Sequence, residues 1–328
     1  MARRAGFGLL ILAVALGVAR GAPAKGDGPT TIAVGYGSVW VGMGGDGSVV
    51  RVNARARRIT ARVRRLSAPP YGGYGFVHSL AVGFGSVWVA AGRYHTLSRI
   101  DPRTNRVVDV HPKRPWTATL VAAGGGAVWA GDFERNAVFR VEPATNRVSA
   151  RILVPGRLWG LAAGRAGVWI ITLAGSRVSP KTPREIRHID PRANTIGPPL
   201  LTSRCDFALA VGLRRLWVSD LCAKTVTAVG RRVGRSVPVA EASVGLAVGK
   251  RAVWVKSQSE PSVRRLDPRN GRLLARIRVR GTWLATNGGD RVWVLDPGDG
   301  RAGLLRTIDS RTNRVVGRPI RIAANPVG

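Results

Sequence analysis

The sequence predicts an all-β fold, a seven-bladed β-propeller with four antiparallel strands in each blade. One motif recurs seven times: a small apolar run such as Leu-Ala-Val-Gly, a Gly-rich turn, and a strand centred on tryptophan. The motif tryptophans are 37 to 48 residues apart, close to the period of about 40 to 45 residues that is typical of propeller blades. The segments are short, β-branched and bounded by Gly, Pro, Asn and Asp, with no long helical period. The seven residues are Trp40, Trp88, Trp129, Trp169, Trp217, Trp254 and Trp293.

Residues 1–24 are predicted to be a secretory signal peptide. Arg3 and Arg4 form a basic start, residues 7–18 are apolar, and Ala22-Pro23-Ala24 offers small residues for cleavage. The apolar run is short for a bilayer span, so an uncleaved anchor is the weaker alternative. No second long apolar run follows. We therefore expect residues 25–328 to form a soluble propeller outside the cytoplasm, without a transmembrane segment once the signal is removed.

Each copy of the motif is expected to form one blade. The first strand is rich in Ala and Gly because it lines a narrow channel, and the second is apolar on both sides because blades stack face to face. In the clearest copy the third strand ends at Asp101-Pro102, where Asp accepts hydrogen bonds from backbone amides and Pro fixes φ. The last copy ends with its fourth strand near Ile322, which predicts a ring closed by packing, without a blade shared between the termini. The predicted blades are 30–66, 78–112, 117–155, 159–200, 206–238, 244–279 and 282–323.

The topology predicts which connections share a face. The links between blades and the loops between strands two and three lie on one face, called the loop face here. The turns between strands one and two and between strands three and four lie on the other, called the turn face. If Gly212 pairs with Arg215, then Cys205 and Cys222 lie opposite each other on the loop face. In an oxidising compartment they would form a disulfide, and two free thiols are the alternative.

The loop face also collects aromatic and histidine side chains that the repeat does not require. Aromatic groups around a channel mouth suit a ligand with flat or sugar-like faces, whereas anchoring of the loops against neighbouring blades is the alternative for each residue. Two histidines near blade 2 would allow proton transfer, and a plain polar role is the alternative. The ligand-binding candidates are Trp116, Trp159, Trp283, Phe207, Tyr94 and His95, and the catalytic candidates are His78 and His95.

Three carboxylates occupy the same repeat position, three residues after the motif tryptophan: Asp132, Asp220 and Asp296. Around a channel mouth they would bind a hard divalent cation through oxygen, although such a cation wants about 6 to 8 oxygen ligands. Capping of the loops explains them equally simply. No other cofactor is expected, and the chain lacks the zinc-protease, esterase and redox motifs His-x-x-x-His, Gly-x-Ser-x-Gly and Cys-x-x-Cys.

The chain is strongly basic, with 52 Lys and Arg against 18 Asp and Glu and a net charge of +34. A GC-rich genome favours arginine but does not explain the shortage of acids, which leaves a polyanionic partner open. The turns between strands three and four place arginines from every blade on the turn face, where they would bind phosphates or carboxylates. A solvated turn that repeats because blades repeat is the alternative. The polyanion-binding candidates are Arg103, Arg106, Arg147, Arg192, Arg269, Arg272, Arg311 and Arg314.

Two stretches carry a family resemblance: IAVGYGSVWV at residues 32–41 and RIDPRTNRVV at residues 99–108. This pattern resembles the bacterial secreted YVTN-type, YncE-like β-propellers over nearly the whole mature chain, and more distantly the virginiamycin B lyase propellers. The resemblance implies a fold far more than an activity, and no catalytic residue is carried over.

The leading hypothesis is a secreted or envelope-associated, monomeric binding propeller whose partner is an anionic envelope polymer, a protein or a small ligand. Nucleic acid is a further polyanion that would fit the basic charge. The alternative is a lyase or hydrolase with its site at the loop-face mouth of the channel, which rests on analogy of fold.

Overall fold

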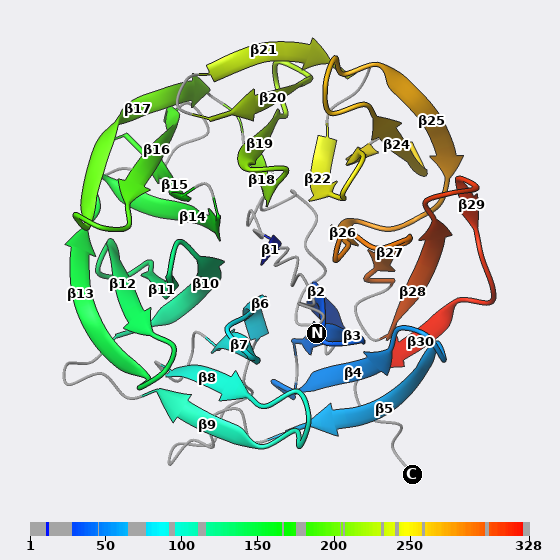
Figure 1. The fold of residues 1–328 in the computed structure, drawn as a ribbon, viewed down its shortest axis with the longest axis horizontal. Helices are drawn as coiled ribbons and strands as arrows, with labels where there is room; N and C mark the ends of the chain where they lie inside the picture. Colours follow the sequence, from blue (N-terminus) through cyan, green and yellow to red (C-terminus); the bar gives the residue numbers. More distant parts are fainter. Residues whose placement is uncertain are drawn as a thin grey trace, which may run out of the picture.

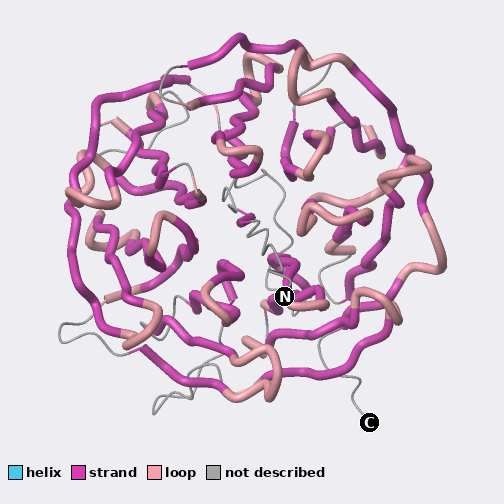
Figure 2. Tube along the Cα trace, in the orientation of Figure 1, coloured by secondary structure: helices cyan, strands magenta, loops and turns pink. Residues whose placement is uncertain are grey.

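In the computed structural model the described residues are 11–12, 28–44, 46–64, 77–91, 96–110, 116–165, 167–174, 182–203, 205, 207–230, 233–239, 243–257, 260–298 and 302–323. They form strands joined by turns and loops (Figure 2). None of these segments is a helix long and apolar enough to span a membrane. The all-β prediction is thereby confirmed.

Seven antiparallel sheets stand around a central axis, and the blade strands of each come from one continuous stretch of chain, in order from the innermost to the outermost strand (Figure 1). Blade 1 is β2 (Pro29–Gly35), β3 (Ser38–Met43), β4 (Val49–Asn53) and β5 (Arg58–Val63). Blade 2 is β6 (Val77–Gly83), β7 (Ser86–Ala91), β8 (Thr96–Ile100) and β9 (Val107–Val110). Blade 3 is β10 (Ala118–Gly124), β11 (Ala127–Asp132), β12 (Ala137–Glu142) and β13 (Arg147–Leu153). Blade 4 is β14 (Arg157–Gly164), β15 (Gly167–Leu173), β16 (Arg184–Asp190) and β17 (Thr195–Ser203).

The remaining three blades complete the ring. Blade 5 is β18 (Phe207–Gly212), β19 (Arg215–Asp220), β20 (Thr225–Val229) and β21 (Val233–Pro238), and β1 (Ile11–Leu12) pairs with the inner edge of β18. Blade 6 is β22 (Ser243–Val248), β23 (Val253–Ser257), β24 (Ser262–Leu266) and β25 (Leu273–Arg278). Blade 7 is β26 (Trp283–Ala285), β27 (Arg291–Asp296) and β28 (Ala302–Asp309), with an outer strand divided into β29 (Arg314–Val315) and β30 (Ile320–Ala323). The seven-bladed prediction is confirmed, and no described blade is shared between the chain ends. Apart from β1, the predicted signal lies outside the described residues.

Glycines at the end of the innermost strands let neighbouring blades approach closely. A Cβ added to Gly35 would overlap the side chain of Val82 in blade 2, and one added to Gly164 would overlap Val211 in blade 5. Since interiors are close-packed, a larger residue there would force the blades apart. The small residues of the motif are therefore required by contact between blades as well as by the channel.

The motif tryptophans lie in the core between blades and are 5% exposed or less. In blades 1 to 3 the indole Nε1 donates a hydrogen bond to the carbonyl of the glycine five residues earlier, at 3.3, 3.1 and 2.9 Å. A buried indole N–H needs such a partner. In these three blades the tryptophan and the glycine of the motif thus form one unit, whereas the indole N–H groups of Trp169 and Trp217 lack a hydrogen-bond partner among the described residues.

An arginine pairs across the sheet from the tryptophan in four blades and links that blade to the next. The guanidinium carbons of Arg51, Arg99, Arg140 and Arg265 lie 5.0, 5.3, 5.8 and 5.4 Å from the indole centroid. Each donates from Nη1 to the turn between strands three and four of the following blade, for example Arg99 to the carbonyl of Pro143 at 2.8 Å and to Asn146 Oδ1 at 3.1 Å. We call this arrangement the interblade clamp. Part of the arginine excess is therefore structural.

The asparagine that receives the clamp is suited to its place in the turn. Asn105, Asn146, Asn194 and Asn313 have φ of 60, 59, 57 and 58°, a left-handed conformation that asparagine tolerates better than most residues. Their side-chain oxygens accept from the arginine of the preceding blade at 3.0, 3.1, 3.4 and 2.8 Å. One residue type thus serves both the turn and the contact between blades.

Three blades lack the clamp arginine. The residues paired with Trp169, Trp217 and Trp293 are His188, Ala228 and Thr307. Blade 5 has a different tie, the disulfide Cys205–Cys222, with 5.6 Å between the Cα atoms. Its hairpin pairs Gly212 with Arg215, the register expected from the sequence, and this confirms the predicted bond.

Candidate functional site

The aromatic candidates of the loop face are distributed over three separate parts of the core. Trp116 is 1% exposed and packs edge-on against Phe139, with ring centroids 5.1 Å apart. Trp159 is half-buried and stacks edge-on with Phe133 at 5.9 Å. Trp283 packs against the core between blades 7 and 1. These contacts match loop anchoring, the alternative that the sequence left open, and the ligand-binding role stays a prediction. The Phe207 side chain, Tyr94 and His95 lie outside the described residues.

Of the two catalytic candidates, only His78 lies within the described residues. His78 is on β6 and half-buried, and burial lowers the pKa of its imidazole to about 4. It is therefore neutral at pH 7, because desolvation disfavours the charged form. With His95 outside the described residues, the proposed proton-transfer pair remains a prediction.

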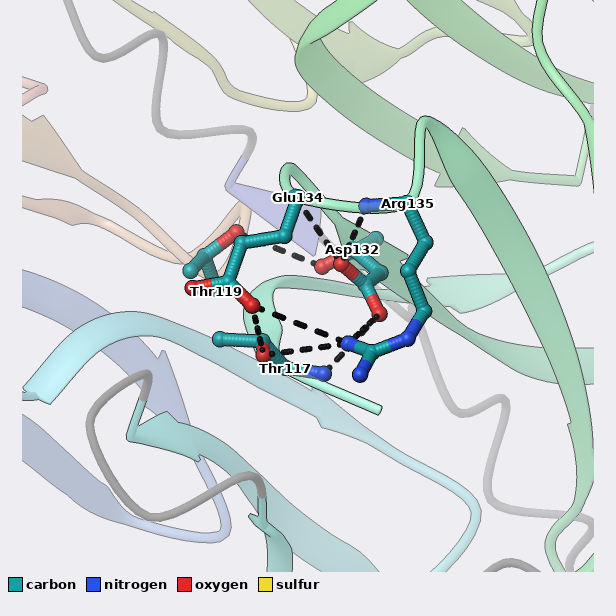
Figure 3. A network of polar contacts seen from close by, with 6 residues as sticks. Thr117, Thr119, Asp132, Glu134 and Arg135 are labelled. Atoms are coloured by element: carbon teal, nitrogen blue, oxygen red, sulfur yellow. Dashed lines mark hydrogen bonds and ion pairs between the residues drawn. The ribbon is translucent and has the colours of Figure 1, made fainter. Parts of the chain in front are cut away.

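The carboxylate of Asp132 is fully buried at the end of β11 and caps the loop that follows (Figure 3). It accepts hydrogen bonds from the backbone amides of Thr117, Glu134 and Arg135, each at 2.9 Å, and from Arg135 Nη1 at 3.2 Å. Thr117 Oγ1 donates to Glu134 Oε2 at 2.8 Å. Both oxygens of Asp132 are thus occupied by donors from the protein.

The two equivalent carboxylates make similar contacts in their own blades. Asp220 Oδ1 accepts from the amides of Cys222 and Ala223 at 2.9 and 3.0 Å. Asp296 accepts from the amide of Gly298 at 3.3 Å and from Arg306 Nη1 at 2.9 Å. Within the described part of the chain, no three His, Cys, Asp or Glu side chains gather as a metal site requires. The observed contacts match loop capping, and the metal role stays a prediction.

The eight arginines predicted to bind polyanions are all exposed on the turn face: Arg103, Arg106, Arg147, Arg192, Arg269, Arg272, Arg311 and Arg314. They lie in or next to the turns between strands three and four of blades 2, 3, 4, 6 and 7, and we call them the outer ring. Arg311 forms an ion pair with Asp290 at 2.8 Å. The interblade clamp holds the turns of blades 2, 3, 4 and 7, so the backbone of these turns is fixed while the exposed arginine side chains extend into solvent.

The acids of these turns are held by the backbone rather than by the outer-ring arginines. Asp101 accepts from the amides of Arg103 and Thr104 at 2.7 and 3.2 Å, and these hydrogen bonds lower the pKa of its carboxyl. The backbone amides of Arg192 and Ala193 lower the pKa of the Asp190 carboxyl in the same way, and those of Thr312 and Arg311 lower the pKa of Asp309. Apart from Arg311, which pairs with Asp290, the outer-ring guanidinium groups form no ion pair among the described residues and stay available to an external anion.

A second set of cations surrounds the channel mouth on the same face. The turns between strands one and two of blades 4, 5 and 6 carry exposed basic side chains, where blades 1 and 2 carry Tyr36 and Phe84. We call this set the inner arc: Arg165, Arg214, Arg215, Lys250 and Arg251. The prediction from the sequence covered only the turns between strands three and four and missed this set. An alignment of the seven Gly-rich turns, copy by copy, would have found it.

Comparison with solved structures agrees on the architecture. A computationally designed protein, Ika8, has a TM-score of 0.57 and 13% identity, covering 89% of this chain and 98% of its own. Kuenenia stuttgartiensis hydrazine synthase has a TM-score of 0.57 and 12% identity, covering 94% and 99%. The Cps50 (Swd1) β-propeller domain of Myceliophteria thermophila has a TM-score of 0.60 and 12% identity, covering 84% and 95%.

No protein-family model matches the chain, and no curated protein matches its sequence. At these identities the solved structures share the fold alone. Membership of the YVTN-type family stays a prediction, and the comparisons place this chain among the β-propellers.

Proposed function

We propose that the protein is an extracytoplasmic binding module whose turn face holds an anionic polymer of the cell envelope. The observation that carries the proposal is the pairing of the outer ring with the inner arc on one face, with the turn acids capped by backbone amides. The chain acts as a rigid disc that presents positive charge in a fixed pattern. A β-propeller suits such a binding role.

A polymer fits this face better than a small anion. The outer ring extends over five blades, so its arginines lie too far around the disc to meet on one phosphate. A flexible polyanion can follow the turns and contact many guanidinium groups in succession. Each contact releases counterions, which makes the affinity fall steeply with salt concentration.

The disulfide of blade 5 supports a location outside the cytoplasm. Cys205 and Cys222 are joined across a hairpin at the protein surface, where Cys222 is exposed. Disulfides of this kind persist in oxidising compartments and are rare in a reducing cytosol. Envelope polymers rich in phosphate or carboxylate are the polyanions that such a protein meets.

The test compares three variants with the same change in charge. The outer variant is Arg103→Gln, Arg106→Gln, Arg311→Gln and Arg314→Gln, and the inner variant is Arg214→Asn, Arg215→Gln, Lys250→Gln and Arg251→Gln. Asn replaces Arg214 because its φ is 60°. The control variant removes four exposed arginines of the rim and loop face: Arg151→Gln, Arg157→Gln, Arg235→Gln and Arg321→Gln. Binding of poly(glycerol phosphate) is measured at several salt concentrations.

The outer and inner variants should bind more weakly and with a shallower dependence of log K on log salt. Each cation that no longer binds a phosphate should lower the slope by about 0.7, so the slope of each variant should fall by up to about 3. The control variant should behave like the wild type. If binding weakened equally in all three variants, the effect would come from net charge alone, and the proposed site would be rejected. Tighter binding to a DNA duplex than to poly(glycerol phosphate) would identify nucleic acid, and not the envelope polymer, as the partner.

A further inference from the structure

A groove of about 290 Å³ lies between blades 6 and 7, and one of its lining residues, Val315, directly follows Arg314 of the outer ring. It is lined by Pro261, Arg278, Val279, Arg280, Arg306 and Val315. In Figure 1 the end of β25 lies beside β29. The volume equals about ten times the ~30 Å³ share of one water molecule, which is enough for a small organic molecule.

The groove arises from an irregularity in the outer strand of blade 7. β29 pairs with Ile308 and Asp309, and β30 pairs with residues 302–305, so residues 316–319 bulge opposite only two residues of β28. Gly317 allows this bulge, with φ of 66°. Arg306 therefore has no partner in an outer strand, and its guanidinium turns to Asp296 at 2.9 Å and to the carbonyl of Arg280 at 3.4 Å.

The charges around the groove do not balance. Asp296 is already paired with Arg306, whose side chain is 17% exposed. Glu260 is paired with Arg276 and lies 3.8 Å from Arg264. The described residues provide no acid for the two exposed side chains of Arg278 and Arg280. Arg278 and Arg280 therefore line the groove without an ion pair to any acid among the described residues.

The remaining walls are apolar. Val315 is 41% exposed and Pro261 is exposed, so these two side chains supply the apolar part of the lining, whereas Val279 is 5% exposed and packs in the core. A site that combines an apolar wall with convergent cations fits a ligand with one oxyanion group on a small apolar body. Arginine suits this role because its fork of N–H groups binds the two oxygens of a carboxylate or phosphate together.

We infer that this groove is a binding site for a small organic oxyanion, with Arg278 and Arg280 binding the anion and Pro261 and Val315 contacting its apolar part. None of its lining residues belongs to the outer ring or the inner arc, and a ligand there would join the outer strands of two blades. Arg306 acts as a positioning residue, because it holds the carbonyl of Arg280 and the carboxylate of Asp296.

The experiment uses phenyl phosphate as the probe and the intact protein in about 0.15 M salt, where long-range attraction is largely screened. Titration calorimetry compares phenyl phosphate with inorganic phosphate and with phenol. Phenyl phosphate should bind more tightly than either, because only this probe uses both halves of the groove. Binding no tighter than that of inorganic phosphate would overturn the inference.

Variants assign the binding to the groove. Arg278→Gln with Arg280→Gln should weaken phenyl phosphate binding by about tenfold or more, since each charged hydrogen bond contributes roughly that factor. Val315→Glu, at an exposed position, should weaken it comparably by adding a negative charge. The control Arg103→Gln with Arg106→Gln should leave it unchanged. If phenyl phosphate binding weakened equally in that control, the attraction would be non-specific and the site would be rejected. Unchanged binding in both groove variants would also reject the site. Neither outcome depends on the result for poly(glycerol phosphate).

Discussion

Replacing Arg99 by methionine tests the interblade clamp directly. Arg99 Nε donates to Ser86 Oγ at 2.7 Å, and Nη1 donates to the Pro143 carbonyl and Asn146 Oδ1 at 2.8 and 3.1 Å. The guanidinium carbon lies 5.3 Å from the centroid of Trp88. Methionine keeps the packing of the aliphatic stem and removes these four interactions.

The expected destabilisation follows from the solvent access of each partner. The two acceptors in blade 3 are at the turn face and regain water, and each of the three hydrogen bonds, including the one to the buried Ser86, contributes about 1 kcal/mol. The stacking on tryptophan adds about 0.5–1 kcal/mol. Arg99→Met should therefore lower the free energy of unfolding by about 3–4 kcal/mol. For a domain of this size the melting temperature should fall by roughly 6–12 °C.

The assay is thermal unfolding followed by tryptophan fluorescence, with Arg106→Met as the matched control. Arg106 is exposed in the same blade and its side chain has no hydrogen bond or ion pair within the described structure, so it should change stability by less than about 0.5 kcal/mol. A double-mutant cycle with Asn146→Gly, which preserves the positive φ of 59°, should show coupling of about 1 kcal/mol. Equal melting temperatures for the two methionine variants, or no coupling in the cycle, would refute the clamp.

Three further predictions concern other ties in the fold. Replacing Cys205 and Cys222 by serine should lower the free energy of unfolding by about 3 kcal/mol, which denaturant titration measures, and reductant should then have no further effect. Gly164→Ala should cost about 1–3 kcal/mol in the same assay because its Cβ would overlap blade 5, whereas Gly230→Ala, with open space around it, should not destabilise. His78 has a pKa of about 4 when folded and about 6.5 when unfolded. The unfolded chain therefore gains the proton first as the pH falls, and stability should drop by about 3 kcal/mol between pH 6.5 and pH 4. His78→Gln should flatten this part of the profile, and an unchanged profile would contradict the assignment.

Much of the architecture could be predicted because each blade repeats its own local signals. In blade 2, Trp88 marks the second strand and Asp101 marks the turn after the third strand. The same signals mark the same elements in other copies, because they do not depend on the adjacent blades. The Gly212–Arg215 hairpin sets the register that brings Cys205 to Cys222, and hairpin register follows from the turn alone.

The loop-face aromatics were harder to place because strand length differs between blades. Trp116 lies two residues before β10 begins, Trp159 lies inside β14, and Trp283 is the first residue of β26. All three precede a motif by a few residues in the sequence. Because the first strand begins at a different position in each blade, however, their side chains pack into different parts of the core. Their burial could not be read from the repeat.

The sequence alone determined the number of blades, the strand order, the disulfide and the face on which the outer arginines lie. These features depend on short-range turn chemistry and on the antiparallel order of four strands. Only the tertiary structure decided which arginines are used between blades, as in Arg51 with Asn105, 54 residues away. It also decided that Val315 of blade 7 lies with Arg278 and Arg280 of blade 6 around one groove. Such contacts exist only after the ring has closed, because closure brings together surfaces that no single repeat contains.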